Sequence, residues 1–273
     1  MSTISNMVGT GFYSSFFNAN SANKNQNAAQ NSINSLWSSY NSYTSNSMNA
    51  LSGLSEIKSG VASVLSSYDD AKEAFYSEFD ENISALSSSA EKVKSYDFKV
   101  GEDAITKTDS TNEDGEKVTT TTYSKDMQAA LDTVKKFVDD YNSTINFLSD
   151  NSSVSKRVSR MAQNFGDTTY RSANYSSIGI NVNSDGTMKI DEEKLANTIA
   201  NDPSKVSSVL GKDGLAGKAE SHISTAKSQR ENLFPTAKNM LGDQLSAAAL
   251  YTSGAYANMT SISNTGNLLN MMF

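Results

Sequence analysis

The chain has 273 residues, a formal net charge of −7 and no cysteine. This acidic balance argues against binding to nucleic acid or to an anionic membrane surface, since both need a basic face. The absence of cysteine excludes disulfides and thiolate metal ligands, and no apolar run approaches the ~18 residues of a membrane helix. Charged residues make up 19% and hydrophobic residues 37% of the chain, so serine, asparagine and threonine are unusually frequent. The composition predicts an elongated, mainly α-helical protein rather than a compact enzyme domain.

Both ends of the chain are almost free of charge. Residues 1–55 carry a single charged side chain, Lys24, and residues 244–273 carry none, yet both segments place apolar residues at helical spacing. Segments of this kind bury little apolar surface alone, so we expect labile arms that become helical on assembly. Two disordered tails are the alternative for the free protein. The asparagine-rich stretch 18–31 is predicted to be a loop.

A long helix is predicted from Leu51 to Ser95, and its stripe dominates the segment 56–98. Apolar residues there recur in steps of four and three, with one additional step of four near Phe79, which is typical of a coiled-coil seam with a local irregularity. The seam consists of Ile57, Val61, Val64, Tyr68, Ala71, Phe75, Phe79, Ile83, Leu86, Ala90 and Val93.

A second seam lies in the first part of the segment 124–176. Its apolar residues recur in steps that alternate regularly between four and three. Ser124 is a predicted N-cap, and Asp126 places an acid in the first helical turn. Two seams in one chain most simply pack on each other, so we predict an antiparallel coiled-coil rod or helical bundle built from 56–98 and 124–176. The second seam consists of Met127, Leu131, Val134, Val138, Tyr141, Ile145 and Leu148.

Candidate residues for the coiled-coil core, or for an interface between copies, come from both seams and from the C-terminal arm 244–273. They are Val61, Tyr68, Phe75, Met127, Leu131, Val134, Val138, Tyr141, Ile145, Leu148, Leu245, Met259, Leu269 and Phe273.

Between the seams, residues 99–123 have a different amino-acid composition. The stretches 103–109 and 117–123 are threonine-rich and β-prone, and Asp114-Gly115 lies in the polar turn between them. They predict a β-hairpin at the end of the helical pair.

The segment 177–243 is predicted to hold a second hairpin followed by short helices. The hairpin strands are 177–182 and 187–190, joined by a turn with Asp185-Gly186. Asp191 is the predicted cap of a helix that begins at Glu192 and ends at Ile199. Asp202-Pro203 starts a further helix that ends at Leu210, because proline is favoured at the first helical position.

A calcium loop is an alternative interpretation of the second hairpin, and the hairpin turn is the preferred one. Lys189 stands at position 9 of that pattern, and the preceding residues alternate like a strand, whereas a calcium loop of this type lies between two helices. The residues at positions 1, 3, 5, 6 and 12 are Asn181, Asn183, Asp185, Gly186 and Glu192.

The sequence shows no arrangement typical of an active site. The one histidine, His222, lies in a pattern typical of an exposed helix face, with no acid at a spacing suited to a proton relay. Gly211 and Gly214 do not have the spacing of a phosphate loop, and no nucleophile-elbow motif occurs. We therefore predict no catalytic residue, no cofactor and no metal site, and no enzymatic function.

Several short motifs between Met127 and Leu215 resemble, in order, the C-terminal region of flagellar hook-associated protein 2, the family that forms the flagellar filament cap. The motifs are Phe137-Val138-x-x-Tyr141-Asn142, Ser177-Ile178-Gly179-Ile180, Asp185-Gly186-Thr187-Met188-Lys189-Ile190-Asp191, Lys194-Leu195 and Asp202-Pro203-x-x-Val206-x-x-Val209-Leu210.

This resemblance implies a secreted, extracellular protein of the bacterial flagellum, exported unfolded by the flagellar type III apparatus. It implies a homo-oligomer at the filament tip that helps flagellin to fold and insert, with flagellin, other hook-associated proteins and an export chaperone as partners. The sequence departs from the family's pattern, because the usual large outer region is here at most Lys99–Ser124 and the N-terminal motif is not evident.

Two functional hypotheses follow from different classes. The favoured one is a cap-like structural and assembly protein that acts in motility. The alternative is a secreted coiled-coil adhesin or surface-interaction protein whose tip is the threonine-rich hairpin, or another flagellar axial subunit.

Overall fold

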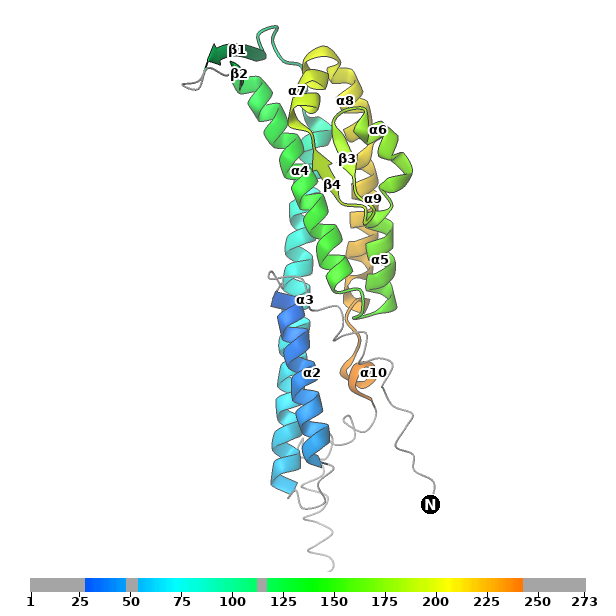
Figure 1. The fold of residues 1–273 in the computed structure, drawn as a ribbon. Coiled ribbons are helices and arrows are strands. Elements are labelled where there is room, and N and C mark those ends of the chain that lie inside the picture. The colour runs from blue at the N-terminus through cyan, green and yellow to red at the C-terminus, as the bar shows by residue number, and fades with distance from the viewer. Residues whose placement is uncertain (1–27, 48–53, 112–116, 243–273) are drawn as a thin grey trace, which may run out of the picture. The chain divides into compact units, whose positions relative to one another are not determined.

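The computed structural model describes residues 28–47, 54–111 and 117–242 (Figure 1). In these ranges the chain is mainly helical and contains two small antiparallel pairs of strands, which confirms the predicted fold class. The described residues divide into two compact units, one formed by residues 28–47, 54–77 and 234–242 and the other by residues 78–111 and 117–233. None of the helices described is long and apolar enough to cross a membrane.

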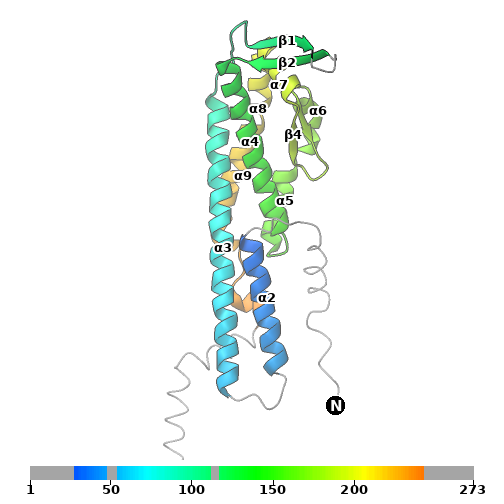
Figure 2. The same cartoon turned by 60° about the vertical axis from the view of Figure 1, so that its left-hand side comes forward.

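In the first unit, helix α2 (Ala28–Ser47) packs antiparallel on the first part of α3 (Leu54–Ser95), as Figures 1 and 2 show. The hydroxyl groups of Ser39 and Ser67 lie 2.9 Å apart. Further along α2, the ring of Tyr43 lies so close to Gly60 of α3 that a Cβ there would meet it at 2.8 Å. Glycine at position 60 therefore permits close contact between the two helices.

Helix α2 corrects part of the predicted asparagine-rich loop. The loop prediction was wrong for residues 28–31, which form the first turn of α2. Ala29, Ile33 and Leu36 follow the i, i+4, i+7 spacing of one helix face, and all three are fully buried. Packing of this face outweighs the local preference of asparagine for loops.

An aromatic cluster ties the segment after residue 233 to α3 within the first unit. The ring of Phe234 lies 5.7 Å from that of Tyr68, 5.5 Å from that of Phe75 and 6.5 Å from that of Tyr76, measured between centroids. The Tyr68 hydroxyl donates a hydrogen bond of 2.9 Å to the Pro235 carbonyl. A short helix, α10 (Ala237–Leu241), follows this cluster.

The predicted seam of α3 is buried along its described length. Each seam side chain from Val61 to Val93 is at most 8% exposed. The side chain of Ile57 lies outside the described residues. The four-and-three spacing therefore correctly predicted which face of α3 packs inward.

In the second unit, α4 (Lys125–Asp150) runs antiparallel to the C-terminal part of α3. The rings of Phe79 and Phe147 lie 6.4 Å apart, and the Thr144 hydroxyl lies 3.5 Å from the Asn82 carbonyl oxygen. All seven predicted seam residues of α4 are at most 2% exposed. The predicted cap is also confirmed, because the Ser124 side chain accepts a hydrogen bond from the backbone of Met127.

The hairpin between these helices consists of β1 (Ile105–Thr111) and β2 (Lys117–Tyr123) (Figure 2). Ile105 pairs with Tyr123 and Thr108 with Thr120. The first strand begins two residues later than predicted, because residues 102–103 form a turn after α3. The predicted Asp114-Gly115 turn lies outside the described residues.

The remaining elements of the second unit follow α4 in chain order. They are α5 (Lys156–Gly166), η2 (Thr169–Arg171), α6 (Ser172–Ser176), β3 (Ile180–Val182), β4 (Met188–Ile190), α7 (Glu192–Asn201), α8 (Pro203–Leu210), α9 (Leu215–Gln229) and η3 (Arg230–Asn232).

The short hairpin β3–β4 and the two helices after it match their predictions closely. The first strand begins at Ile180, because Gly179 has a φ of +90° and a Cβ there would lie 2.6 Å from the Leu195 nitrogen. Asp191 caps α7 through the Lys194 N–H at 3.0 Å. Pro203 is the first residue of α8, which Asp202 caps in the same way.

Candidate functional site

The structure places ten of the fourteen candidate interface residues inside the chain's own core. The other four, Leu245, Met259, Leu269 and Phe273, lie outside the described residues. Their assignment to an interface between copies stays a prediction. The ten that are buried within one chain are Val61, Tyr68, Phe75, Met127, Leu131, Val134, Val138, Tyr141, Ile145 and Leu148.

Two neighbouring side chains of α4 hold other elements of the second unit in place. The side-chain amide of Asn142 donates to the Met188 carbonyl at 2.7 Å, and its oxygen accepts from the Met188 N–H at 2.8 Å. Tyr141 donates its buried hydroxyl to the Phe165 carbonyl at 3.1 Å. The Tyr141-Asn142 motif thus fixes strand β4 and the end of α5 against α4, a role that spacing alone did not indicate.

The carboxylate of Asp185 is used within the β3–β4 turn. It accepts hydrogen bonds from the Thr187 N–H at 2.9 Å and from the Thr187 hydroxyl at 2.6 Å, and these bonds hold the pKa of Asp185 below its usual value. Gly186 has a φ of +87°, and a Cβ there would overlap the Gly166 carbonyl. The turn therefore has a structural reason for Asp-Gly, and no three His, Cys, Asp or Glu side chains gather into a metal cluster among the described residues.

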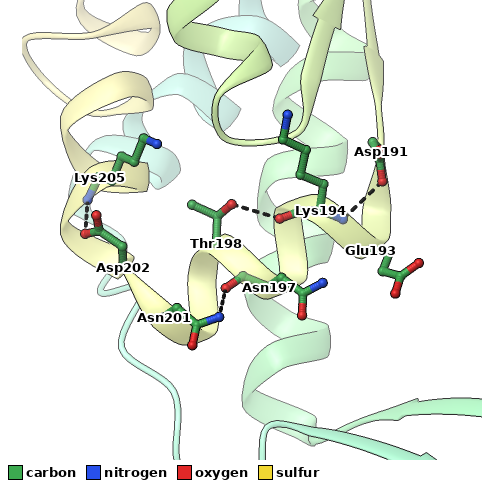
Figure 3. A pocket seen from close by; sticks show the side chains of 8 residues that line it. All are labelled: Asp191, Glu193, Lys194, Asn197, Thr198, Asn201, Asp202 and Lys205. Atoms are coloured by element: carbon green, nitrogen blue, oxygen red, sulfur yellow. Dashed lines mark hydrogen bonds between the residues drawn. The ribbon is translucent and has the colours of Figure 1, made fainter.

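An open hollow of about 480 Å³ lies over α7 and α8 (Figure 3). Its polar side chains mostly bond to the backbone of their own helices. Thr198 donates to the Lys194 carbonyl at 2.8 Å, Asn201 donates to the Asn197 carbonyl at 2.7 Å, and Asp191 and Asp202 serve as caps. These bonds stabilise helix ends and turns and leave few groups directed at a ligand.

A second hollow, of about 520 Å³, lies between α5 and α9, and we call it the α5–α9 hollow. Arg157 and Arg160 are exposed at its rim, whereas Met161 and Phe165 are buried beneath it. The lining contains no aspartate or glutamate. It consists of Arg157, Arg160, Met161, Asn164, Phe165, His222, Thr225, Ser228, Gln229 and Asn232.

His222 lines the same hollow and is half-buried, so the prediction that it is solvated on a helix surface was only partly correct. Its ring lies 5.2 Å from that of Phe165, and its Nε2 is buried without a hydrogen-bond partner in the described part of the chain. Burial, together with the positive charge of Lys218, lowers the pKa of His222 below its usual value. Contact between α9 and α5 shields the Nε2 side of this ring from water and leaves the residue half-buried, and helical periodicity could not reveal that contact.

Two further features are exposed to solvent, a group of threonines and a tyrosine. Thr106, Thr108, Thr120 and Thr122 are exposed on the β1–β2 hairpin. Tyr170, in the short helix η2, is 88% exposed, more than any other large hydrophobic side chain in the described ranges.

The described elements thus define a protein built from packed amphipathic helices, whose buried polar groups serve the packing. Residues 147–259 match the family model of the flagellar hook-associated protein 2 C-terminus, which confirms the resemblance found in the sequence. That family is a structural one of the bacterial flagellum, an extracellular organelle, and is not a family of enzymes. Comparisons with curated proteins and with solved structures gave no match.

Proposed function

We propose that the chain is a cap-like hook-associated protein, which oligomerises at the tip of the flagellar filament and assists the assembly of flagellin. The observation that carries this proposal is the match of residues 147–259 to the flagellar hook-associated protein 2 C-terminus. The matched span begins in α4 and includes the Asp185-Gly186 turn and the two capped helices. Export as an unfolded chain also suits a protein without cysteine.

The proposed partners are further copies of the chain, flagellin, other hook-associated proteins and a flagellar export chaperone. The predicted arms, residues 1–55 and 244–273, carry a single charged side chain, Lys24. Their parts outside the described residues, 1–27 and 244–273 among them, are proposed to become helical against neighbouring copies. Deleting residues 244–273 should therefore weaken self-association, measured by light scattering at matched concentration. The described helices should keep their circular-dichroism signal, and unchanged association of the truncated chain would contradict this role.

The function itself is tested by deleting the gene in its own bacterium. The expected result is loss of swimming with flagellin released into the medium as unassembled subunits, and both defects should be repaired by the full chain supplied in trans. Normal swimming and intact filaments in the deletion strain would contradict a cap role.

An adhesin-like or surface-interaction role is the second candidate, and the exposed threonines of the β1–β2 hairpin favour it. Serine substitutions at Thr106, Thr108, Thr120 and Thr122 keep hydroxyl groups but remove the methyl groups from the hairpin surface. Reduced attachment of otherwise motile cells would support adhesion. Unchanged attachment would exclude the hairpin as the adhesive element.

A further inference from the structure

Three nitrogen-bearing side-chain groups line the α5–α9 hollow without a hydrogen-bond or ion-pair partner in the described part of the chain. No hydrogen bond or ion pair within the described residues involves the guanidinium group of Arg157 or that of Arg160. The buried Nε2 of His222 also has no hydrogen-bond partner there. By contrast, the nearby Arg230 binds both carboxylate oxygens of Asp80, at 2.7 and 2.6 Å. The unpaired arginines therefore mark a surface suited to a carboxylate-bearing partner.

A matching acidic face lies on α3. At about 100° per residue, Asp70, Glu73, Ser77 and Glu81 point to one side of the helix, and all four are exposed. No ion pair in the described ranges involves these three acids. Lys72, the nearest base in the sequence, lies roughly 100° or more around the helix from each of them.

The two surfaces also agree in spacing. Arg157, Arg160 and Asn164 stand at positions i, i+3 and i+7 of α5, and Asp70, Glu73 and Ser77 stand at the same positions of α3. Each charged pair is therefore separated by about 4.5 Å along its helix axis. Two arginines can face two carboxylates at once, with a polar side chain one turn further along each helix.

We propose that the α5–α9 hollow binds the acidic α3 face of a second copy of this chain. This inference rests on the proposed assembly function and specifies its contact. The interface joins two different patches, so it is heterologous and can be repeated from copy to copy, as the closure of a ring requires. Arg157 and Arg160 are exposed in the single chain, above the buried Met161 and Phe165. A second copy that covers the hollow excludes water from the arginines, which strengthens their charged hydrogen bonds.

Cysteine cross-linking tests this contact directly in the full chain, which has no native cysteine. The variants Asn164→Cys and Ser77→Cys each carry one thiol. We expect a mixture of the two to form a disulfide-linked dimer rapidly on mild oxidation, at least tenfold faster than Ser77→Cys mixed with Ser208→Cys, an exposed serine of α8 that does not line this hollow. Equal rates in the two mixtures would overturn the proposal.

Charge reversal provides the second measurement. Arg157→Glu with Arg160→Glu should raise the concentration for half-maximal association at least tenfold, and Asp70→Arg with Glu73→Arg should do the same. Mixing the two reversed variants should restore association, since each supplies the complement of the other. Lys189→Glu with Lys212→Glu is the control for the arginine reversal, since it changes the net charge by the same amount at exposed positions outside the hollow, and it should associate like wild type.

The outcomes separate the contact from the proposed function. Arginine-reversed protein that associates normally and restores swimming to the deletion strain would overturn the contact and leave the assembly function standing. A mixture of the Asn164→Cys and Ser77→Cys chains that forms no cross-link at any concentration, together with a deletion strain that swims normally, would overturn both. Inhibition of the cross-link by ~1 M salt, where charges are screened within about 3 Å, is the expected result for an interface built on ion pairs.

Discussion

Helices α2 and α4 both pack on α3, but they are built from very different sequences. Helix α2 has no charged residue, and three of its apolar side chains are fully buried: Ala29, Ile33 and Leu36. Helix α4 has a charged outer face and twelve buried residues. Because free energy of unfolding scales with the apolar area buried, α4 should be a stable part of the second unit, and α2 should open more readily. Helix α3 should thus have one stably packed partner, α4, and a second partner, α2, that detaches from it more readily.

The largest expected effect is that of an unpaired charge in the α4 core. Leu131→Asp places a carboxylate at a fully buried position, and the loss of stability should exceed about 4 kcal/mol, because a buried ion without a partner is very unfavourable. Circular dichroism should show lower helicity and a lower Tm. The control Asn146→Asp puts the same charge on the exposed face of α4 and should leave Tm within a few degrees of wild type. An unchanged Tm for Leu131→Asp would show that α4 does not depend on this core.

The same cavity-forming substitution, isoleucine to alanine, can be made in α4 and in α2 to compare how each helix contributes to stability. Ile145→Ala in α4 should cost about 2–5 kcal/mol of global stability, the usual range for a buried isoleucine, whereas Ile33→Ala should mainly release α2. Hydrogen exchange measures both: the first variant should accelerate exchange throughout residues 78–233, and the second only within residues 28–47. Equal acceleration of the whole chain by both variants would mean that the two helices form one cooperative unit.

Loss of the two hydrogen bonds between the Asn142 side chain and the Met188 backbone should have an intermediate effect on stability. Asn142→Ala leaves the Met188 N–H and carbonyl without their partners, and each unsatisfied group costs about 1–3 kcal/mol when it is buried. We expect a lower denaturation midpoint with a native-like helical spectrum. Ser143→Ala, at the next and exposed position, is the matched control, and the prediction fails if both variants unfold at the same denaturant concentration.

The smallest effect concerns pH and His222. Burial and Lys218 lower its pKa in the folded state, while the unfolded chain keeps a value near 6.5. The unfolded state then binds more protons, so this contribution to stability is present above about pH 6.5 and is lost as the pH falls toward the folded-state pKa. Denaturation midpoints between pH 7.5 and 5 should fall less steeply for His222→Gln than for wild type. Identical slopes would show that His222 titrates as a solvated side chain.

The sequence predicted the elements that depend on local signals. The four-and-three spacing identified the buried faces of α3 and α4. Ser124 and Asp191 were recognisable caps, because a cap depends on residues three positions apart, and Pro203 marked the start of the next helix. Gly186 marked a turn that requires positive φ.

The features that depend on contacts between distant segments were not predictable in this way. The asparagine-rich beginning of α2 is helical because Ala29 and its neighbours along the helix are buried in the first unit. The Nε2 atom of His222 is shielded from water by α5, more than fifty residues earlier in the chain. The α5–α9 hollow exists only when the two helices pack side by side, so Arg157 and Arg160 appear in the sequence as ordinary surface charges.

Immunogold electron microscopy of flagellated cells tests the central claim most directly, with an antibody against the chain and the deletion strain as the blank. A structural cap protein should be labelled at the distal ends of filaments. Label confined to the cell surface or the cytoplasm, on cells whose filament ends remain unlabelled, would contradict the assignment.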